Sequence, residues 1–359
     1  RRKLSLLAVL PFALPLSSFA SFAVWHLAAT GSLPSFSYIP YIRKEPLAAA
    51  TIFQKLVGLV TGLGGATVFP LVLLRMLFTK KVDIAIYLFL SAPLTIWAVL
   101  RQLTGEHGLA ETILLALLAP LGLMLLYWAY TEGWKRYRQR PAGRSAQGIL
   151  VLLWLSVVMV SVVVFLPYSS VRYLLPLFPP VILVFVWLVE DRLGAASLSG
   201  KNLLVAAALV TAAGGLLVAH ADFELADSKR LFAENEAVAL RDQAAASGNK
   251  LWFSSEFGVR YYMERQGFEE LTGESVLKEG DLVVLPLLAG SAIPTDEQGS
   301  RLELIDDISP GAMSPLRITD HRVGAGFYGS RWGLLPYSFS TEGLDEYLVY
   351  RVASPTKTD

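Results

Sequence analysis

One segment of the chain combines a single cation with a tyrosine and several prolines. It runs from Pro167 to Pro180 with the sequence PYSSVRYLLPLFPP, and Arg172 and Tyr173 stand at the start of its apolar part. An arginine at the depth of lipid head groups can bind a phosphate through paired hydrogen bonds. The alternative is that Arg172 and Tyr173 only anchor a membrane helix at the interface. The prolines that follow predict a kink that frees backbone carbonyls.

A second group of ionisable residues lies in RQLTGEHGLAE, residues 101–111. Glu106 and His107, with Glu111 one turn further along, are residue types that serve as general acid and base or as metal ligands. A solvated turn between two helices has the same composition. The sequence leaves both interpretations open, and with them the need for a divalent metal.

Two more cations, Arg43 and Lys44, follow the first apolar stretch. They have the right charge to contact a lipid phosphate or an anionic acceptor. The simpler interpretation is that they face the lipid head groups.

These residues belong to a chain of unusual composition. Of its 359 residues 54% are hydrophobic and 17% are charged, and the mean hydropathy is +0.49. A typical soluble domain has about 25% charged residues, so this composition disfavours an ordinary cytosolic enzyme. Seven stretches approach the roughly 20 apolar residues that a spanning helix needs: Leu4–Ala29, Leu56–Phe78, Ile84–Leu100, Thr112–Tyr130, Gly148–Leu166, Tyr173–Val189 and Leu203–Ala221.

The distribution of Lys and Arg predicts the orientation. One set of connecting segments is rich in them, above all the run KRYRQRPAGR at residues 135–144, and this set is expected on the cytoplasmic side. An amino terminus in the cytoplasm and seven spans place everything after Ala221 outside an inner (plasma) membrane. Residues 1–221 carry 18 Lys and Arg against 7 Asp and Glu, whereas residues 222–359 carry 13 against 23. This asymmetry predicts that the first part lies in a membrane and the second in water.

Residues 222–359 have the length of one small domain. Residues 228–247 predict an amphipathic helix and residues 256–266 a second helix, while Lys250–Phe253, Asp281–Leu285, Leu302–Ile305 and Tyr347–Val352 predict strands. The expected fold is therefore a polytopic α-helical membrane protein, residues 1–221, with an extracytoplasmic α/β domain, residues 222–359. The segment Gly324–Tyr337 (GAGFYGSRWGLLPY) predicts a loop whose rings are available for contact.

Several functional classes leave no trace in the sequence. The chain has no cysteine, which excludes disulfides, thiolate metal sites and cysteine nucleophiles. It has no phosphate-binding loop of the Walker type and no HExxH or GxSxG motif. The basic run at 135–144 is better explained by contact with anionic lipid than with nucleic acid.

The segment VRYLLP followed by FPP, on the penultimate apolar stretch before an outside α/β domain, resembles the late Arg-Tyr-Pro signature of polyprenol-phosphate-dependent glycosyltransferases. These enzymes form the GT-C superfamily, and the chain is most similar to its family 39, the protein O-mannosyltransferase and aminoarabinose transferase relatives. Residues 250–267 (KLWFSSEFGVRYYMERQG) and 279–284 (EGDLVV) are similar to the segment that follows the last span in bacterial members. The resemblance covers residues from about 151 onward and, more loosely, the earlier spans.

This resemblance implies an outward-facing transferase that moves a sugar from a polyprenyl-phosphate donor to a protein, glycan or lipid acceptor. It implies that Arg172 neutralises the lipid phosphate, that Tyr173 orients it, and that an acid in the first outside loop is the general base. That loop, Thr30–Lys55, holds one acid, Glu45, and no acidic pair. Because family members usually have more spans and carry that loop near their amino terminus, we expect either a catalytic part upstream of Arg1 or its loss.

A function of another class remains open. The chain could be a non-catalytic membrane subunit or scaffold whose outside domain binds a partner within a larger complex. The missing acidic pair favours this alternative. The proline-broken span beside Arg172 favours the enzyme, because an inert scaffold has little need of it.

Overall fold

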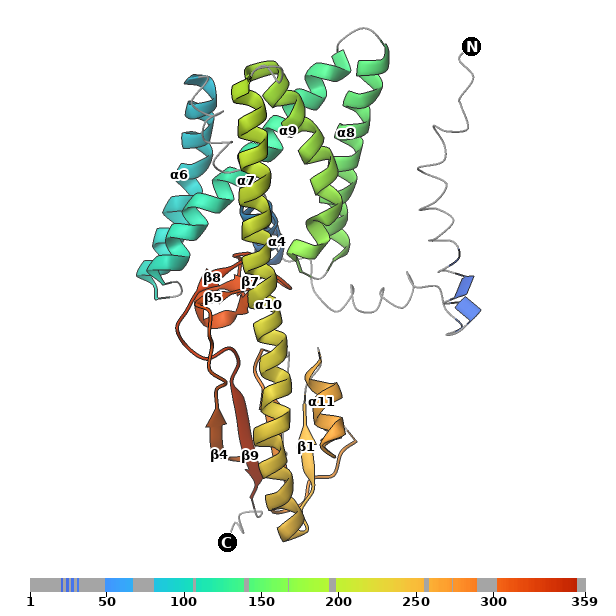
Figure 1. Cartoon of the computed structure of the whole chain (residues 1–359), viewed down its shortest axis with the longest axis vertical. Coiled ribbons are helices and arrows are strands. Elements are labelled where there is room, and N and C mark those ends of the chain that lie inside the picture. Colours follow the sequence, from blue (N-terminus) through green and yellow to red (C-terminus); the bar gives the residue numbers. More distant parts are fainter. Residues whose placement is uncertain are drawn as a thin grey trace.

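The structure is a computed structural model that describes residues 21, 24–25, 27–28, 31, 49–66, 81–105, 108–138, 142–166, 168–193, 198–254, 258–272, 274–288 and 302–353. A helical bundle forms one end of the molecule and a five-stranded sheet the other (Figure 1). One helix, α10 (Leu198–Ser247), runs the whole way between them. We call the part from residue 222 onward the C-terminal domain, and the end of the bundle that faces it the domain end.

Five helical stretches are long and apolar enough to cross a membrane. They are α6 (Lys81–Leu103), α7 (Leu109–Arg138), α8 (Ala142–Val160) with the π-helical turn η1 (Ser161–Phe165), the 3-10 helix η2 (Val171–Leu177) with α9 (Phe178–Leu193), and the first half of α10. They match the last five of the seven expected spans. The first expected span falls almost entirely outside the described residues, and the second is described only up to Ala66, so a count of seven is not confirmed.

The second half of the helix α4 (Ala49–Ala66) is buried in the bundle and is packed against α7 without intervening side chains. A Cβ atom added to Gly64 would collide with the carbonyl of Leu118, and one added to Gly122 would collide with the carbonyl of Val60. Small residues let two membrane helices approach at backbone distance, where dispersion contacts hold them together. The glycine-rich face of α4 therefore serves packing.

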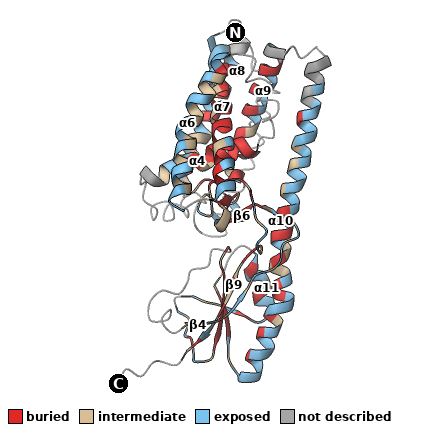
Figure 2. Cartoon of the chain, turned by 90° about the vertical axis from the view of Figure 1, so that its left-hand side faces the viewer, coloured by how far each residue is buried: buried red, intermediate tan, exposed pale blue. Residues whose placement is uncertain are grey.

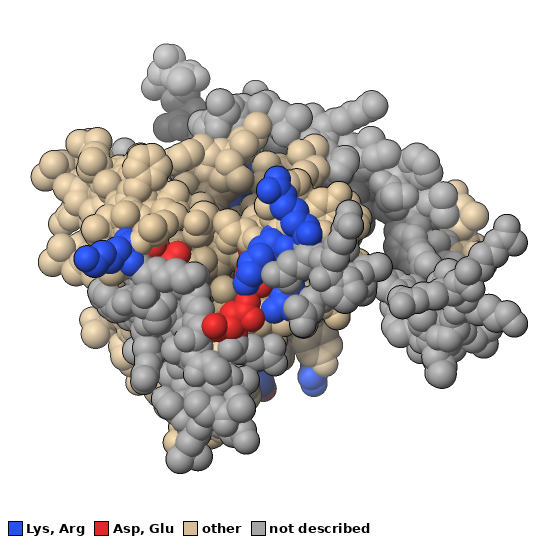
Figure 3. All heavy atoms as spheres, turned by 90° about the horizontal axis from the view of Figure 1, so that it is seen from above, with Lys and Arg blue, Asp and Glu red and all other residues tan. Residues whose placement is uncertain are grey.

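The far end of the bundle carries charges that pair with one another. Glu132 is buried and accepts hydrogen bonds from Arg136 at 3.0 Å and from Lys135 at 3.3 Å, and Lys135 also pairs with Asp191 of α9 at 2.6 Å. Figure 3 views the molecule from this end and shows acidic and basic groups side by side. These pairs fix the end of α7 against α9.

The helix α10 changes character along its length. Its bundle half exposes apolar side chains, among them Leu209 at 67% and Leu216 at 73%, as expected of a face that contacts lipid (Figure 2). Its second half packs Phe232, Ala237 and Leu240 onto the sheet. The expected domain boundary at residue 221 therefore falls inside a continuous helix.

The sheet is mixed, with the order β2-β1-β3-β9-β4. Strands β1 (Leu251–Phe253), β2 (Glu269–Glu270) and β3 (Leu282–Pro286) are parallel, and β9 (Tyr347–Val352) runs antiparallel between β3 and β4 (Leu302–Ile308). One face is covered by α10 and by α11 (Val259–Arg265). The four strands predicted from the sequence are all present, with ends shifted by at most a few residues. The second predicted helix contains α11, whereas the first, residues 228–247, is only the last part of α10, which begins at Leu198.

Two small strand pairs lie between the sheet and the bundle (Figure 1). They are β5 (Leu316–Arg317) with β8 (Ser338–Phe339), and β6 (Thr319–Asp320) with β7 (Ala325–Gly326). They hold the segment Gly324–Tyr337, which we call the aromatic loop. Its Leu334 and Leu335 are buried against Val57 of α4 and Leu115 of α7. The loop thus fixes the C-terminal domain to the domain end of the bundle.

Candidate functional site

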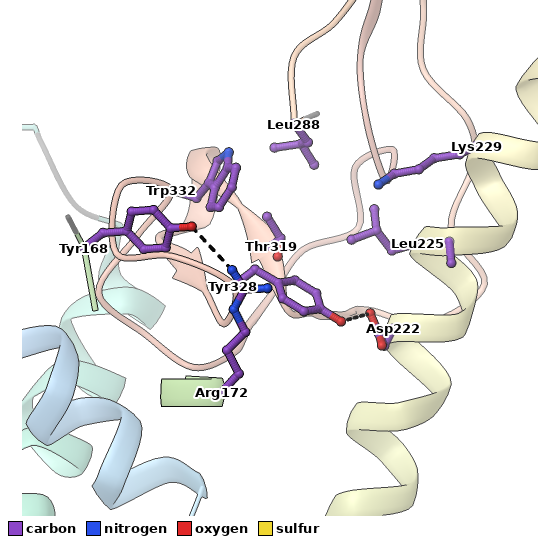
Figure 4. Close-up of a pocket in the computed structure, with 10 residues that line it drawn as sticks. Tyr168, Arg172, Asp222, Leu225, Lys229, Leu288, Thr319, Tyr328 and Trp332 are labelled. Atoms are coloured by element: carbon purple, nitrogen blue, oxygen red, sulfur yellow. Dashed lines mark hydrogen bonds between the residues drawn. The ribbon is translucent and has the colours of Figure 1, made fainter. Parts of the chain in front are cut away.

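A cavity of about 300 Å³ opens where the bundle, α10 and the aromatic loop meet (Figure 4). Its walls come from the turn before η2, from one face of α10 and from loops of the C-terminal domain. The lining residues are Tyr168, Arg172, Asp222, Leu225, Ala226, Lys229, Leu288, Thr319, Tyr328 and Trp332. Arg172, the arginine singled out by the sequence, is therefore part of a pocket.

Local chain geometry places Arg172 at the domain end of a span. The span α8–η1 ends at Leu166, whose backbone is extended, and the chain re-enters the bundle through η2 and α9. Pro176 lies inside η2, and Pro179 and Pro180 lie in the first turn of α9, where missing amide donors are tolerated. Where the sequence predicts a kink, the helix changes from 3-10 to α between Leu177 and Phe178, and Arg172 lies in the first turn of η2.

The Arg172 guanidinium is held by aromatic side chains. Its Nη2 donates to the hydroxyl of Tyr173 at 3.2 Å and to that of Tyr168 at 3.4 Å, and its Cζ lies 5.1 Å from the ring centroid of Tyr173. Among the described residues no carboxylate pairs with it. Tyr173 contacts the Arg172 guanidinium through both its hydroxyl and its ring.

The backbone beside Arg172 is bonded to the aromatic loop. Val171 N–H and Ser170 Oγ–H both donate to the carbonyl of Phe327 at 3.0 Å. Ser330 N–H donates to the carbonyl of Ser169 at 2.8 Å, and Ser169 N–H donates to Ser330 Oγ at 3.2 Å. The position of Arg172 therefore depends on the C-terminal domain as well as on the span.

The acid that lines the pocket is Asp222, one residue past the last expected span. It accepts a hydrogen bond from the Tyr328 hydroxyl at 2.7 Å. Burial, with the Asp222 carboxylate next to it, raises the pKa of Tyr328 to about 12, although Arg172 acts in the opposite direction. Tyr328 is therefore protonated at every physiological pH and serves as a donor.

The inner wall of the pocket carries a hydroxyl with an unmet hydrogen bond. Thr319 is 5% exposed, and its Oγ1 has no partner among the described residues. In Figure 4 it lies in the wall between Leu288 and Tyr328. A buried polar atom without a partner costs about 1–3 kcal/mol, so this one indicates a place for a ligand hydroxyl or a water.

Of the remaining candidates from the sequence, only Glu111 is described, and it does not line this pocket. Glu111 is buried at the start of α7, with its carboxylate against Gly324, whose φ is +65°. Arg43, Lys44, Glu45, Glu106 and His107 lie outside the described residues. No group of three His, Asp or Glu suited to a metal occurs in the described part of the chain.

Sequence reasoning missed most of the pocket. Asp222 lies at the expected boundary between the two parts, Lys229 lies in the expected amphipathic helix, and Thr319 lies in a two-residue strand. The signal that was present is the aromatic loop, which supplies Tyr328 and Trp332.

Comparison of the chain with protein-family models, with curated proteins and with solved structures finds no match.

Proposed function

We propose that the chain is a membrane glycosyltransferase, or its C-terminal portion, that transfers a sugar from a polyprenyl-phosphate donor to an acceptor outside the membrane. The observation that carries the proposal is Arg172, which has no carboxylate partner among the described residues and lines a pocket at the end of a membrane span. The basic far end of the bundle supports the orientation, with the pocket on the extracytoplasmic side.

The place of Arg172 suits the phosphate of a lipid. The guanidinium lies at the end of an apolar helix, the depth at which the head group of a polyprenyl lipid is expected. Two tyrosine hydroxyls occupy only one of its terminal nitrogens. The remaining donors suit the planar, two-point recognition of a phosphate.

The pocket beyond Arg172 suits one small polar group. Its volume of about 300 Å³ is at the lower end for ligand sites. Thr319 and Asp222 offer hydrogen bonds to sugar hydroxyls, and the Trp332 ring offers an apolar wall. We assign the sugar to this space, with the polyprenyl chain extending along the bundle into lipid.

Transfer breaks the bond between the sugar anomeric carbon and the phosphate oxygen and forms a bond to an acceptor oxygen. Arg172 stabilises the charge that develops on the departing phosphate, which is where such a site gains rate. The acceptor hydroxyl loses its proton to a carboxylate. Asp222 is the carboxylate in the pocket, and Glu45, outside the described residues, stays the prediction made from the first loop.

The test is transfer by the native full-length protein in lipid nanodiscs. A panel of polyprenyl-phosphate-linked hexoses and pentoses is supplied with cell-envelope acceptors, and released polyprenyl phosphate is measured. Arg172→Ala should lower kcat/KM at least 100-fold, the size of effect seen when one charge-stabilising donor is removed. Arg172→Lys should recover part of the loss. Arg101→Ala is the matched control, because Arg101 also stacks on an aromatic ring, Trp97, at the domain end but outside the pocket.

Unchanged transfer by Arg172→Ala would remove the phosphate role. A wild-type protein that binds no polyprenyl lipid and purifies in a stoichiometric complex would instead identify a non-catalytic subunit.

A further inference from the structure

A second guanidinium reaches the same ring as Arg172 but comes from the C-terminal domain. The Cζ atom of Arg331 lies 5.2 Å from the ring centroid of Tyr168 and 4.4 Å from that of Trp332. Arg172 contacts the hydroxyl end of the same Tyr168 at 3.4 Å. Both rings line the pocket. Two like charges thus converge on one tyrosine at the pocket's edge.

The stacking of Arg331 decides which of its atoms face outward. When ring faces cover a guanidinium, its N–H groups point along the edges of the plane and stay accessible to an acceptor. Arg331 is exposed, and among the described residues no acceptor takes a hydrogen bond from it. Among the described residues, neither Arg331 nor Arg172 pairs with a carboxylate. An anion bound beside Tyr168 would offset the repulsion between them.

The backbone fixes the two arginines relative to one another. Ser330, the neighbour of Arg331, is joined by two hydrogen bonds to Ser169, the neighbour of Tyr168. Gly329 permits this approach, because a Cβ there would lie 2.9 Å from the Trp332 ring and 3.1 Å from the Tyr168 ring. The second cation is therefore built into the site by the fold of the aromatic loop.

We propose that Arg331 is a second ligand of the lipid phosphate. The membrane part, through Arg172, and the C-terminal domain, through Arg331, then bind the same phosphate. This inference rests on the proposed function. A sugar phosphodiester carries one negative charge, and the polyprenyl phosphate that leaves carries nearly two. The second cation therefore interacts more strongly with the departing phosphate than with the bound donor, and its loss lowers kcat more than it raises KM.

The experiment compares Arg331→Gln, Arg331→Lys and Arg172→Gln with the control Arg265→Gln, all in full-length protein in nanodiscs. Arg265 is a matched control because it is exposed and also stacks on a tyrosine, Tyr261, at 5.6 Å, but lies in α11 away from the pocket. The first readout is the Kd for a polyprenyl monophosphate, measured separately from transfer. Parallel arms use inorganic phosphate and phosphatidylglycerol. The second readout is kcat and KM for transfer.

Arg331→Gln should weaken polyprenyl monophosphate binding at least 10-fold, with Arg331→Lys intermediate and Arg265→Gln unchanged. Transfer by Arg331→Gln should show a larger change in kcat than in KM. If Arg331→Gln behaves like Arg265→Gln while Arg172→Gln loses binding, this inference is wrong and the proposed function stands. An equal loss toward phosphatidylglycerol would show a general contact with anionic lipid and would also overturn it. If Arg172→Gln and Arg331→Gln both bind normally, the proposed function fails as well.

Discussion

The Tyr328 hydroxyl donates a hydrogen bond to Asp222 at 2.7 Å and so links the aromatic loop to the point where α10 leaves the bundle. The two residues are 106 positions apart in the chain. Their contact forms the side of the pocket that begins beside Arg172, and it keeps one carboxylate oxygen of Asp222 fixed in direction (Figure 4). A carboxylate that acts as a general base must be held in the right direction, and the Tyr328 hydroxyl does this for Asp222.

Asp222→Asn should therefore reduce transfer by at least 100-fold while polyprenyl phosphate still binds, because the amide cannot accept the proton. Tyr328→Phe should cause a smaller loss, of about 10-fold, by removing only the orienting bond. The control is Asp227→Asn, which affects a partly exposed ion pair with Arg230 on the same helix. Normal kcat in Asp222→Asn would exclude Asp222 as the base and leave the candidates predicted from the sequence, Glu45 and the group Glu106, His107 and Glu111.

Docking of the aromatic loop should be needed for phosphate binding even where no pocket residue is changed. Leu335 is 1% exposed and packs between α4 and α7, so Leu335→Ala should cost about 2–5 kcal/mol locally. Hydrogen exchange should then rise at the amide of Val171, which is bonded to Phe327, and the affinity for polyprenyl phosphate should fall. Met313→Ala, at a residue 84% exposed, is the control. Unchanged exchange at Val171 would mean that the loop is held without Leu335.

The contact between α4 and α7 should not tolerate a methyl group. Gly64→Ala places a Cβ against the carbonyl of Leu118, a backbone atom that cannot move aside cheaply. We expect a loss of about 3 kcal/mol in unfolding free energy, the upper part of the range for overpacking. Gly215→Ala in α10 meets no atom within 4 Å and should be neutral or slightly stabilising. Thermal unfolding in detergent measures both, and equal Tm values would disprove the close packing.

The stability of the C-terminal domain should depend on Asp345. Burial raises the pKa of this carboxyl from 3.8 to about 6, although the amides of Leu288 and Glu346 donate to it. Because the folded-state pKa is raised, the contribution of Asp345 is fully present below pH 3.8 and is lost as the pH rises through 6. Relative to Asp345→Asn, the wild type should lose about 2.4 kcal/mol between pH 4 and pH 7.5. A difference that does not vary with pH would contradict the raised pKa.

The membrane helices and the strands could be predicted from the sequence because both rest on local patterns. Apolar length alone marks the stretches that become α6 to α10, and branched residues mark β3 and β9. The continuity of α10 could not be read in this way. The change from apolar to charged residues at Asp222 is typical of a boundary, yet nothing between Leu198 and Ser247 breaks a helix strongly enough to end it.

The sequence pointed to the pocket at Arg172 and, through rings available for contact, at the aromatic loop. Apart from Tyr168, its other residues come from positions 222–229, 288 and 319–332, and no local pattern indicates that segments so far apart meet. The two-residue strands β6 and β7, which carry Thr319 and hold the aromatic loop, are too short to show a period of two. In the sequence, nothing distinguishes Arg331 from other charged residues in loops. Its proposed role follows from its contact with Tyr168 in the structure.

The most direct test of the account is a structure of the full-length protein in nanodiscs with a bound polyprenyl monophosphate. The account predicts the phosphate within hydrogen-bonding distance of the Arg172 guanidinium, at the edge of the pocket lined by Tyr168 and Trp332, with the polyprenyl chain along the bundle. A phosphate bound at another place, with the Arg172 donors turned to water or to protein, would contradict it.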